Sequence, residues 1–290
     1  MIIAQLMGGM GNQMFQYALG RRLAYERGVP LKLDIRWYET TSFRAYKLRH
    51  FNIQESFATP AECERFIGQR FDQRLRRIID RRRLPWGKRP LVNERTLAFD
   101  PDALNAPKAA YLEGYWQSER YFAPIADILR EEFTFKTPPD AANAALGDQI
   151  SSVDAVSLHI RRGDYVSDPG ANQLLGLAPL DYYHEAARRI GAAVGAPHFF
   201  IFSDDIPWAK ANLHIDHPMT FVDHNGAEKD YEDLRLITLC KHHIIANSSF
   251  SWWGAWLAQH PGKIVYAPAR WGNDPALNHP DRVPATWQRL

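Results

Sequence analysis

The chain has 290 residues, of which 46% are hydrophobic and 23% are charged, as expected of a globular protein with room for two domains of ordinary size. Its 35 Lys and Arg residues and 33 Asp and Glu residues leave a formal net charge of +2. A charge so near zero argues against a dedicated nucleic-acid-binding protein, whose affinity comes largely from neutralising phosphates.

Cysteine usage and hydropathy indicate a soluble protein of a reducing compartment. The two cysteines, Cys63 and Cys240, are too few for a disulfide framework or a four-ligand zinc site. The N-terminal residues lack the basic region and the cleavage site of a signal peptide, and no stretch reaches the roughly 18 apolar residues of a membrane-spanning helix. We therefore expect a cytoplasmic location.

The chain opens with the pattern of a strand, a helix and a second strand. Ile2–Leu6 is a short apolar run typical of a buried strand, and the glycine-rich turn Gly8–Asn12 follows it. Apolar residues then repeat at helical spacing, which predicts a helix with one apolar face. Gly28 is placed to end that helix, and Val29–Leu33 resumes an extended run.

The middle of the chain carries a basic segment and a candidate domain boundary. Arg70–Arg83 holds arginines and apolar residues at helical spacing, which predicts a helix with a basic, solvated outer face. Docking near an anionic membrane or a polyanionic acceptor is a secondary interpretation. Pro138-Pro139 and the alanine-rich stretch up to Gly147 look like a crossing between domains. We therefore predict two domains, residues 1–147 and 148–290.

Apolar runs alternate with helical stretches in the second half, which predicts an α/β fold with a parallel sheet covered on both faces. In such a sheet, ligands bind at the carboxyl ends of the strands. Three of the predicted strand ends carry chemically notable residues. The predicted strands are residues 153–160, 198–202, 220–222, 243–246 and 263–267.

Arg161 and Arg162 follow the first of these strands. Guanidinium groups are permanently charged and fork onto phosphate oxygens, so two adjacent arginines could clasp one diphosphate. Gly163 would let the backbone pass close to a ligand. The alternative is a surface salt bridge with Asp164. We favour the diphosphate, because arginines crowded at a strand end repel each other unless an anion arrives.

Asp204 and Asp205 follow the second strand. One acid could cap the helix that Pro207 helps to begin, which is the simpler interpretation for Asp205. The other would point toward the ligand, where a carboxylate can accept two hydrogen bonds from guanine but not from adenine. For either acid taken alone, capping and base recognition are both open.

Small polar residues, Asn247–Ser249, follow the strand at 243–246 and open a predicted helix. The first turn of a helix combines unsatisfied N–H groups with the positive end of the helix dipole, and it therefore binds anions. We expect the tryptophans after Phe250 to pack this helix on its sheet rather than to stack on a sugar.

Two further patterns point away from dinucleotides and metals. The turn at Gly8–Gln13 lacks the third glycine of a dinucleotide-binding turn, and no Gly-Lys-Ser/Thr follows for a P-loop. Asn12 and Gln13 are candidate ligand-binding amides, unless Asn12 simply caps the first helix. Asp100-Pro101-Asp102 matches a metal-binding Asp-x-Asp pattern, but no apolar strand precedes it, and we interpret it as a turn and helix start.

Two of these segments together resemble bacterial α-1,2-fucosyltransferases, glycosyltransferase family eleven: His159–Asp164 with its arginine pair, and the tryptophan-rich Asn247–Leu257. The segments Gly8–Ala18, Glu113–Glu119 and Asp230–Leu234 also resemble that family. The resemblance covers nearly the whole chain. The tryptophan-rich motif is highly specific, and the arginine pair is moderately so.

The resemblance implies a GT-B architecture of two facing Rossmann-like domains, with the acceptor on the side of the first and GDP-fucose bound mainly by the second. It implies inverting transfer of L-fucose from GDP-β-L-fucose to the 2-hydroxyl of a galactose-containing oligosaccharide, with no metal and no other cofactor. A lipopolysaccharide side chain or a free oligosaccharide fits as the acceptor, and a lipid-linked one would bring peripheral contact with a membrane. Nucleic acid is not an implied partner.

Carried over onto this sequence, the resemblance assigns Arg161 and Arg162 to the pyrophosphate. His159 and Asp204 would face the nucleotide, and Asn12 would lie near the fucose and the acceptor. Three residues would meet the phosphates through backbone and hydroxyl groups: Ser248, Ser249 and Phe250.

The general base and two other activities stay open. Inversion suggests a carboxylate near the acceptor hydroxyl, for which Asp164 and Glu119 are the candidates. The alternatives to fucosyl transfer are transfer of another sugar from a GDP-sugar, and a non-catalytic protein that binds a sugar nucleotide or a glycan.

Overall fold

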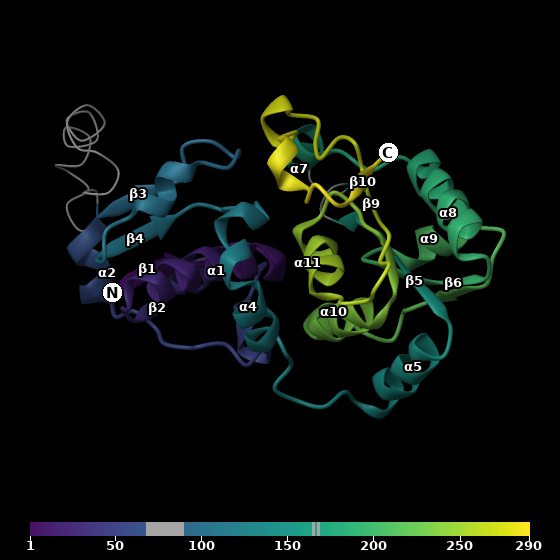
Figure 1. The fold of residues 1–290 in the computed structure, drawn as a ribbon, viewed down its shortest axis with the longest axis horizontal. Helices are drawn as coiled ribbons and strands as arrows, with labels where there is room; N and C mark the ends of the chain where they lie inside the picture. Colours follow the sequence, from purple (N-terminus) through teal and green to yellow (C-terminus); the bar gives the residue numbers. More distant parts are fainter. Residues whose placement is uncertain (68–89, 164–165, 167–168) are drawn as a thin grey trace. The chain divides into compact units, whose positions relative to one another are not determined.

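A computed structural model describes residues 1–67, 90–163, 166 and 169–290. These residues form two compact α/β units, Met1–Lys136 and Thr137–Leu290, each with a sheet whose strands pair in parallel (Figure 1). The predicted α/β class with parallel sheets is confirmed. The basic segment 70–83, predicted to be a helix, lies outside the described residues.

The first unit is built around a four-stranded sheet. Its strands and helices are β1 (Ile2–Gln5), α1 (Met10–Arg27), β2 (Leu31–Asp34), α2 (Pro60–Ile67), β3 (Leu91–Asn93), β4 (Ala110–Glu113) and α4 (Ala126–Glu132). The strand order is β2-β1-β4-β3. Helix α1 packs on one face, where Gly20 lies against Ala4 and Leu31. Helix α2 packs on the other face, where Cys63 joins Ile3 and Tyr111 in one buried cluster.

The ends of α1 follow from its glycines. Gly8 adopts a positive φ of 77° in the turn before the helix, and Gly9 is the N-cap residue. At the other end, Gly28 adopts φ 61°, and its N–H reaches the carbonyl oxygens of Ala24 and Tyr25. The prediction that Gly28 ends this helix is confirmed.

The second unit is built around a six-stranded sheet in the order β10-β9-β8-β5-β6-β7. Its strands and helices are α5 (Ala141–Ser151), β5 (Asp154–Ile160), α7 (Pro169–Leu175), α8 (Leu180–Val194), β6 (Pro197–Ser203), α9 (Ile206–Asn212), β7 (Met219–Phe221), α10 (Asp230–Leu239), β8 (His242–Ile244), α11 (Ser249–Leu257), β9 (Val265–Ala267) and β10 (Gln288–Arg289).

Two buried clusters cover the two faces of this second sheet. On one face, Leu158 and Phe199 pack with residues of α8 and α9, such as Ile190 and Ala209. On the other face, aromatic residues of β6 pack with residues of α5 and α10. Because successive residues of a strand point to opposite faces, the continuous apolar runs of β5 and β6 contribute side chains to both clusters. The result is a sheet between two helical layers (Figure 1).

The division between the units falls earlier than the sequence suggests. It lies between Lys136 and Thr137, whereas we placed it after residue 147. The alanine-rich stretch is not a crossing, because Asp140 caps it as helix α5 and its Oδ1 accepts a hydrogen bond from the Asn143 N–H at 3.0 Å. Ile150 of this helix is buried with the second sheet.

None of the helices among the described residues is both long and apolar enough to span a membrane.

Candidate functional site

Strand β5 stands where the order of the second sheet reverses. The chain runs from β5 to β6 and β7 on one side, and then crosses to β8, β9 and β10 on the other side. At such a switch point the loops beyond neighbouring strands part, and their carboxyl ends leave a crevice for a ligand. The loops in question follow β5 and β8. They begin with Arg161 and with Ile245.

Arg161 and Arg162 bind the two acids that follow β6. Arg161 Nη1 lies 2.9 Å from Asp204 Oδ2. The backbone N–H of Arg162 donates to Asp204 Oδ1 at 2.8 Å, and its Nε donates to Asp205 Oδ2 at 3.2 Å. The pairing follows from the register, because Ile160 of β5 stands opposite the last residue of β6.

These ion pairs correct one expectation. We expected the arginines to repel each other until an anionic ligand arrived, but both already have a carboxylate partner. The two arginines and two acids carry no net formal charge, so they would hold a diphosphate through directed N–H groups rather than through excess charge. Asp164 lies outside the described residues. This applies to both interpretations of Asp164, as the partner in an alternative salt bridge and as a candidate base.

The two acids have different positions. Asp205 is the N-cap of α9, where its Oδ1 accepts a hydrogen bond from the Trp208 N–H at 3.2 Å, so the capping interpretation is confirmed. Asp204 has both carboxylate oxygens on the arginine pair. A Cβ at Gly163 would lie 2.5 Å from Asp204 Oδ2, so glycine is needed for this approach.

His159 is a buried neutral histidine beside this group. It is 6% exposed, and its ring centre lies 5.5 Å from that of Phe250. Burial lowers the pKa of His159 to about 4; Asp204 opposes this shift and Arg161 adds to it. No residue in the described part of the chain hydrogen-bonds His159 Nδ1. The neutral His159 imidazole therefore has a buried ring nitrogen, Nδ1, close to Phe250 in the first turn of α11.

Helix α11 begins directly beyond β8. Ser248 is its N-cap and accepts a hydrogen bond from the Phe250 N–H at 3.3 Å. Asn247 is buried and donates through Nδ2 to backbone oxygens of Leu175, Gly176 and Trp271 at 3.1, 3.2 and 3.0 Å. It therefore fixes the loop before the helix rather than pointing freely into solvent.

The tryptophans of α11 are buried, which confirms that they pack the helix. Trp252, Trp253 and Trp256 are at most 6% exposed, and their rings contact one another at centroid distances of 5.1 to 6.2 Å. The indole N–H of Trp252 donates to the Arg282 carbonyl at 2.8 Å. This packing holds α11 in place, with its first turn directly beyond β8.

Asn12 belongs to the first unit. It lies within the first turn of α1 but does not cap it, since Gly9 is the N-cap and makes no side-chain cap bond. The capping alternative for Asn12 is therefore wrong. Its Oδ1 instead accepts a hydrogen bond from Gln117 Nε2 at 2.7 Å.

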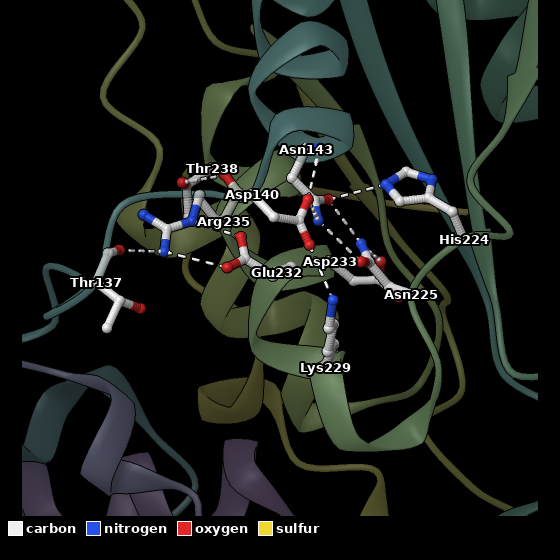
Figure 2. A network of polar contacts seen from close by, with 10 residues as sticks. All are labelled: Thr137, Asp140, Asn143, His224, Asn225, Lys229, Glu232, Asp233, Arg235 and Thr238. Atoms are coloured by element: carbon white, nitrogen blue, oxygen red, sulfur yellow. Dashed lines mark hydrogen bonds and ion pairs between the residues drawn. The ribbon is translucent and has the colours of Figure 1, made fainter.

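Another polar cluster at the carboxyl edge of the second sheet was missed by the sequence analysis. Asn143 of α5 and Asn225, in the loop after β7, exchange two hydrogen bonds of 3.0 and 2.8 Å (Figure 2). His224 Nε2 lies 3.0 Å from the same Asn143 Oδ1. Asn225 also donates to Asp233 at 2.9 Å. Isolated amides carry no periodic signal, so only the fold brings them together.

The segment Asp230–Leu234 supplies the α10 side of this cluster. Burial raises the pKa of Asp233 to about 7, against the lowering effect of its hydrogen bond from Asn225. Glu232 pairs with Arg235 at 2.7 Å, and Arg235 also donates to the Thr137 carbonyl at 2.7 Å (Figure 2). The segment thus ties α10 to α5 and to the loop after β7.

The Asp100-Pro101-Asp102 pattern is a turn and helix start, as predicted. Asp100 caps a short 3₁₀ helix by accepting from the Asp102 N–H at 3.1 Å, and Arg95 pairs with both acids. Within residues 1–67, 90–163, 166 and 169–290, no three His, Cys, Asp or Glu side chains are grouped to hold a metal ion.

Comparison with known sequences identifies the family. The sequence profile of glycosyl transferase family 11 matches residues 93–289, more than half of the chain. The chain belongs to glycosyl transferase family 11. An α-1,2-colitosyltransferase of Escherichia coli is 37% identical over 100% of this chain and 98% of its own length. The E. coli O-antigen biosynthesis glycosyltransferase WbnK is 34% identical over 92% of this chain and 93% of its own.

Comparison with solved structures shows the fold. The NodZ α-1,6-fucosyltransferase from a crystal soaked with GDP-fucose superposes with a TM-score of 0.51 and 15% identity, over 89% of this chain and 92% of that one. The predicted GT-B fold class, with two Rossmann-like α/β units, is therefore confirmed.

Proposed function

We propose that this family 11 glycosyltransferase moves L-fucose from GDP-β-L-fucose to the 2-hydroxyl of a galactose in an oligosaccharide acceptor. The observation that carries the proposal is that Arg161 and Arg162 follow β5 while α11 begins beyond the neighbouring strand β8, at the switch point of the sheet. The full-length likeness to an α-1,2-colitosyltransferase supports an α-1,2 linkage in the product.

The donor would lie with its diphosphate between the arginine pair and α11. Arg161 and Arg162 would share their guanidinium N–H groups between the acids and the phosphate oxygens. The first-turn amides of α11 and the hydroxyl of Ser249 would meet the phosphates from the other side. Neutral His159 would face the nucleotide without adding charge, because its pKa is lowered to about 4.

In transfer, the bond between fucose C1 and the β-phosphate oxygen breaks, and its electron pair stays on GDP. The acceptor 2-hydroxyl oxygen bonds to C1 from the opposite face and passes its proton to a carboxylate base or to water, so the β-linked donor gives an α-linked product. Charge grows on the departing phosphate oxygen. Arg161, Arg162 and the positive end of α11 are preorganised to stabilise that charge.

We also propose that this transfer requires no divalent metal ion. Metal-dependent transferases use the ion to neutralise the diphosphate as it departs. Two guanidinium groups and a helix N-terminus can supply the same stabilisation from the chain itself.

A second candidate donor is GDP-colitose. It is favoured by the 37% identity over the whole chain to the E. coli α-1,2-colitosyltransferase. Colitose is L-fucose without its 3-hydroxyl, so both donors would present the same GDP to Arg161, Arg162 and α11. The likeness to an O-antigen biosynthesis enzyme supports a lipopolysaccharide side chain as the acceptor, with peripheral contact at the inner membrane where the acceptor is lipid-linked.

A donor panel tests this function. Purified protein is incubated with lactose and, separately, GDP-fucose, GDP-colitose, GDP-mannose and UDP-galactose, and products are identified by mass spectrometry and NMR. We expect an α-1,2-linked product that carries fucose if GDP-fucose is the donor and colitose if GDP-colitose is the donor. The preferred donor should have a kcat/KM about 10²-fold above GDP-mannose and UDP-galactose, a discrimination of the size that a lost buried hydrogen bond provides. Tight binding of GDP without product from any donor would instead identify a sugar-nucleotide-binding protein.

A further inference from the structure

The first unit has a switch point of its own. From β1 the chain continues to β2 on one side of the sheet, whereas β3 and β4 lie on the other side. The crevice expected at the carboxyl edge therefore lies between the loops after β1 and β4. Asn12 lies in the first turn of α1, directly after the loop that follows β1, and Gln117 lies in the loop after β4. Their amides are joined by the 2.7 Å hydrogen bond.

The turn after β4 is held in an uncommon conformation by a carboxylate. Among the described residues other than glycine, only Trp116 has a positive φ, at 56°. Glu94, directly beyond β3, accepts hydrogen bonds from the N–H groups of Tyr115 and Trp116 at 2.7 and 2.9 Å. A Cβ at Gly114 would collide with the Glu94 side chain, so glycine permits this close approach. A bulky residue with positive φ costs free energy that the surrounding contacts must offset.

Glu94 thereby fixes an aromatic ring at the same edge. Tyr115 is 36% exposed, and Trp116 beside it is 1% exposed, so the turn buries one ring and presents the other. Tyr38, beyond β2, donates its hydroxyl to the Gly8 carbonyl at 3.1 Å. Burial raises the pKa of Tyr38, Arg44 opposes the shift, and nearby Tyr115 adds to it, which places the two tyrosines in one neighbourhood.

The chemistry of this edge suits a neutral sugar. Aromatic rings stack on the apolar face of a pyranose, and amides donate to and accept from its hydroxyls. Both Glu94 carboxylate oxygens already accept backbone N–H groups. The corresponding edge of the second unit is different, because arginines and a helix N-terminus follow its neighbouring strands β5 and β8.

We propose that the edge formed by Tyr115 and Gln117 binds the acceptor saccharide. Glu94 is the positioning residue, because its hydrogen bonds to the backbone of the turn after β4 fix where Tyr115 and Gln117 lie. The inference rests on the proposed transfer to a galactoside, and it names the acceptor subsite of that reaction. Glu94 touches backbone and not the sugar, so its effect passes through Tyr115 and Gln117.

Steady-state kinetics with GDP-fucose and lactose test the proposal. Tyr115→Ala and Glu94→Gln are each expected to raise the KM for lactose about tenfold, the size of one lost aromatic contact. Tyr115→Phe keeps the ring and should retain the wild-type KM for lactose. The KM for GDP-fucose and its slow hydrolysis without acceptor should be unchanged in all three variants. Asp102→Asn, which removes one carboxylate from the Arg95 ion pairs beyond β3, is the matched control.

A binding measurement separates failure of this inference from failure of the proposed transfer. Saturation-transfer NMR of lactose on the full chain needs no turnover. At one lactose concentration below saturation, it should give the same signal with wild type and Tyr115→Phe and a clearly weaker signal with Tyr115→Ala or Glu94→Gln. An unchanged lactose signal in Tyr115→Ala would overturn the proposal. So would displacement of lactose by inorganic phosphate, or a Glu94→Gln variant whose KM values for lactose and GDP-fucose rise together.

Discussion

Arg161→Ala and Arg162→Ala are each expected to reduce kcat for transfer by about 10²–10³, the loss seen when one preorganised donor to a developing oxyanion is removed. In the proposed mechanism, each variant removes N–H donors to the departing diphosphate. Each also leaves a carboxylate, Asp204 or Asp205, without its ion-pair partner at the proposed diphosphate site. The measurement is initial rate against donor concentration, with thermal unfolding to show that the fold persists.

The arginine experiment has two controls. Arg188→Ala removes an exposed arginine that pairs with Glu185 on α8, and it should leave turnover unchanged. The double variant Arg161→Ala/Asp204→Asn should recover part of the loss, because it removes the unpaired carboxylate as well as the guanidinium. Near-normal turnover in both single alanine variants would contradict the role assigned to the pair.

Ser249→Asp is expected to weaken GDP binding about 10²-fold while leaving the fold intact, because a carboxylate in the first turn of α11 competes with the diphosphate for the same amides. Ser249 is the first residue of the helix, directly after the Ser248 N-cap. An acidic residue at a helix start stabilises the helix by about 0.3–1 kcal/mol, so thermal stability should be equal or higher.

Calorimetry with GDP measures this effect, and Ser249→Asn is the matched control because it has the same shape without the charge. Loss of GDP binding with retained stability separates ligand repulsion from damage to α11. An affinity for GDP within about threefold of wild type in Ser249→Asp, a change below 1 kcal/mol, would place the diphosphate elsewhere.

The sequence predicts the second sheet well because its strands are unambiguous apolar runs. The strands predicted at 153–160 and 198–202 correspond to β5 and β6. By contrast, β3 and β4 were not predicted. Their sequences, Leu91–Asn93 and Ala110–Glu113, are very short apolar runs that end in a polar or charged residue, and no α-helix lies in the described residues between them to give the alternation seen in the second half. The loops beyond them, with Glu94 and Tyr115, were therefore not recognised as part of one edge.

The residue types at the site were also predictable, but their pairing was not. The sequence shows arginines after one predicted strand and acids after the next. It does not show that these two strands are neighbours in the sheet. Only the register that sets Ile160 opposite Ser203 brings Arg161 to Asp204. For the same reason the sequence could not show that the Asn12 side chain bonds to Gln117, which lies far along the chain.

The central claim is that this chain stabilises the departing GDP with its own cations and a helix N-terminus. The most direct measurement is the transfer rate from GDP-fucose or GDP-colitose to lactose after exhaustive chelation, compared with the rate in added magnesium or manganese. We predict the same rate in all three conditions. Loss of transfer on chelation, with recovery on addition of either ion, would contradict the claim.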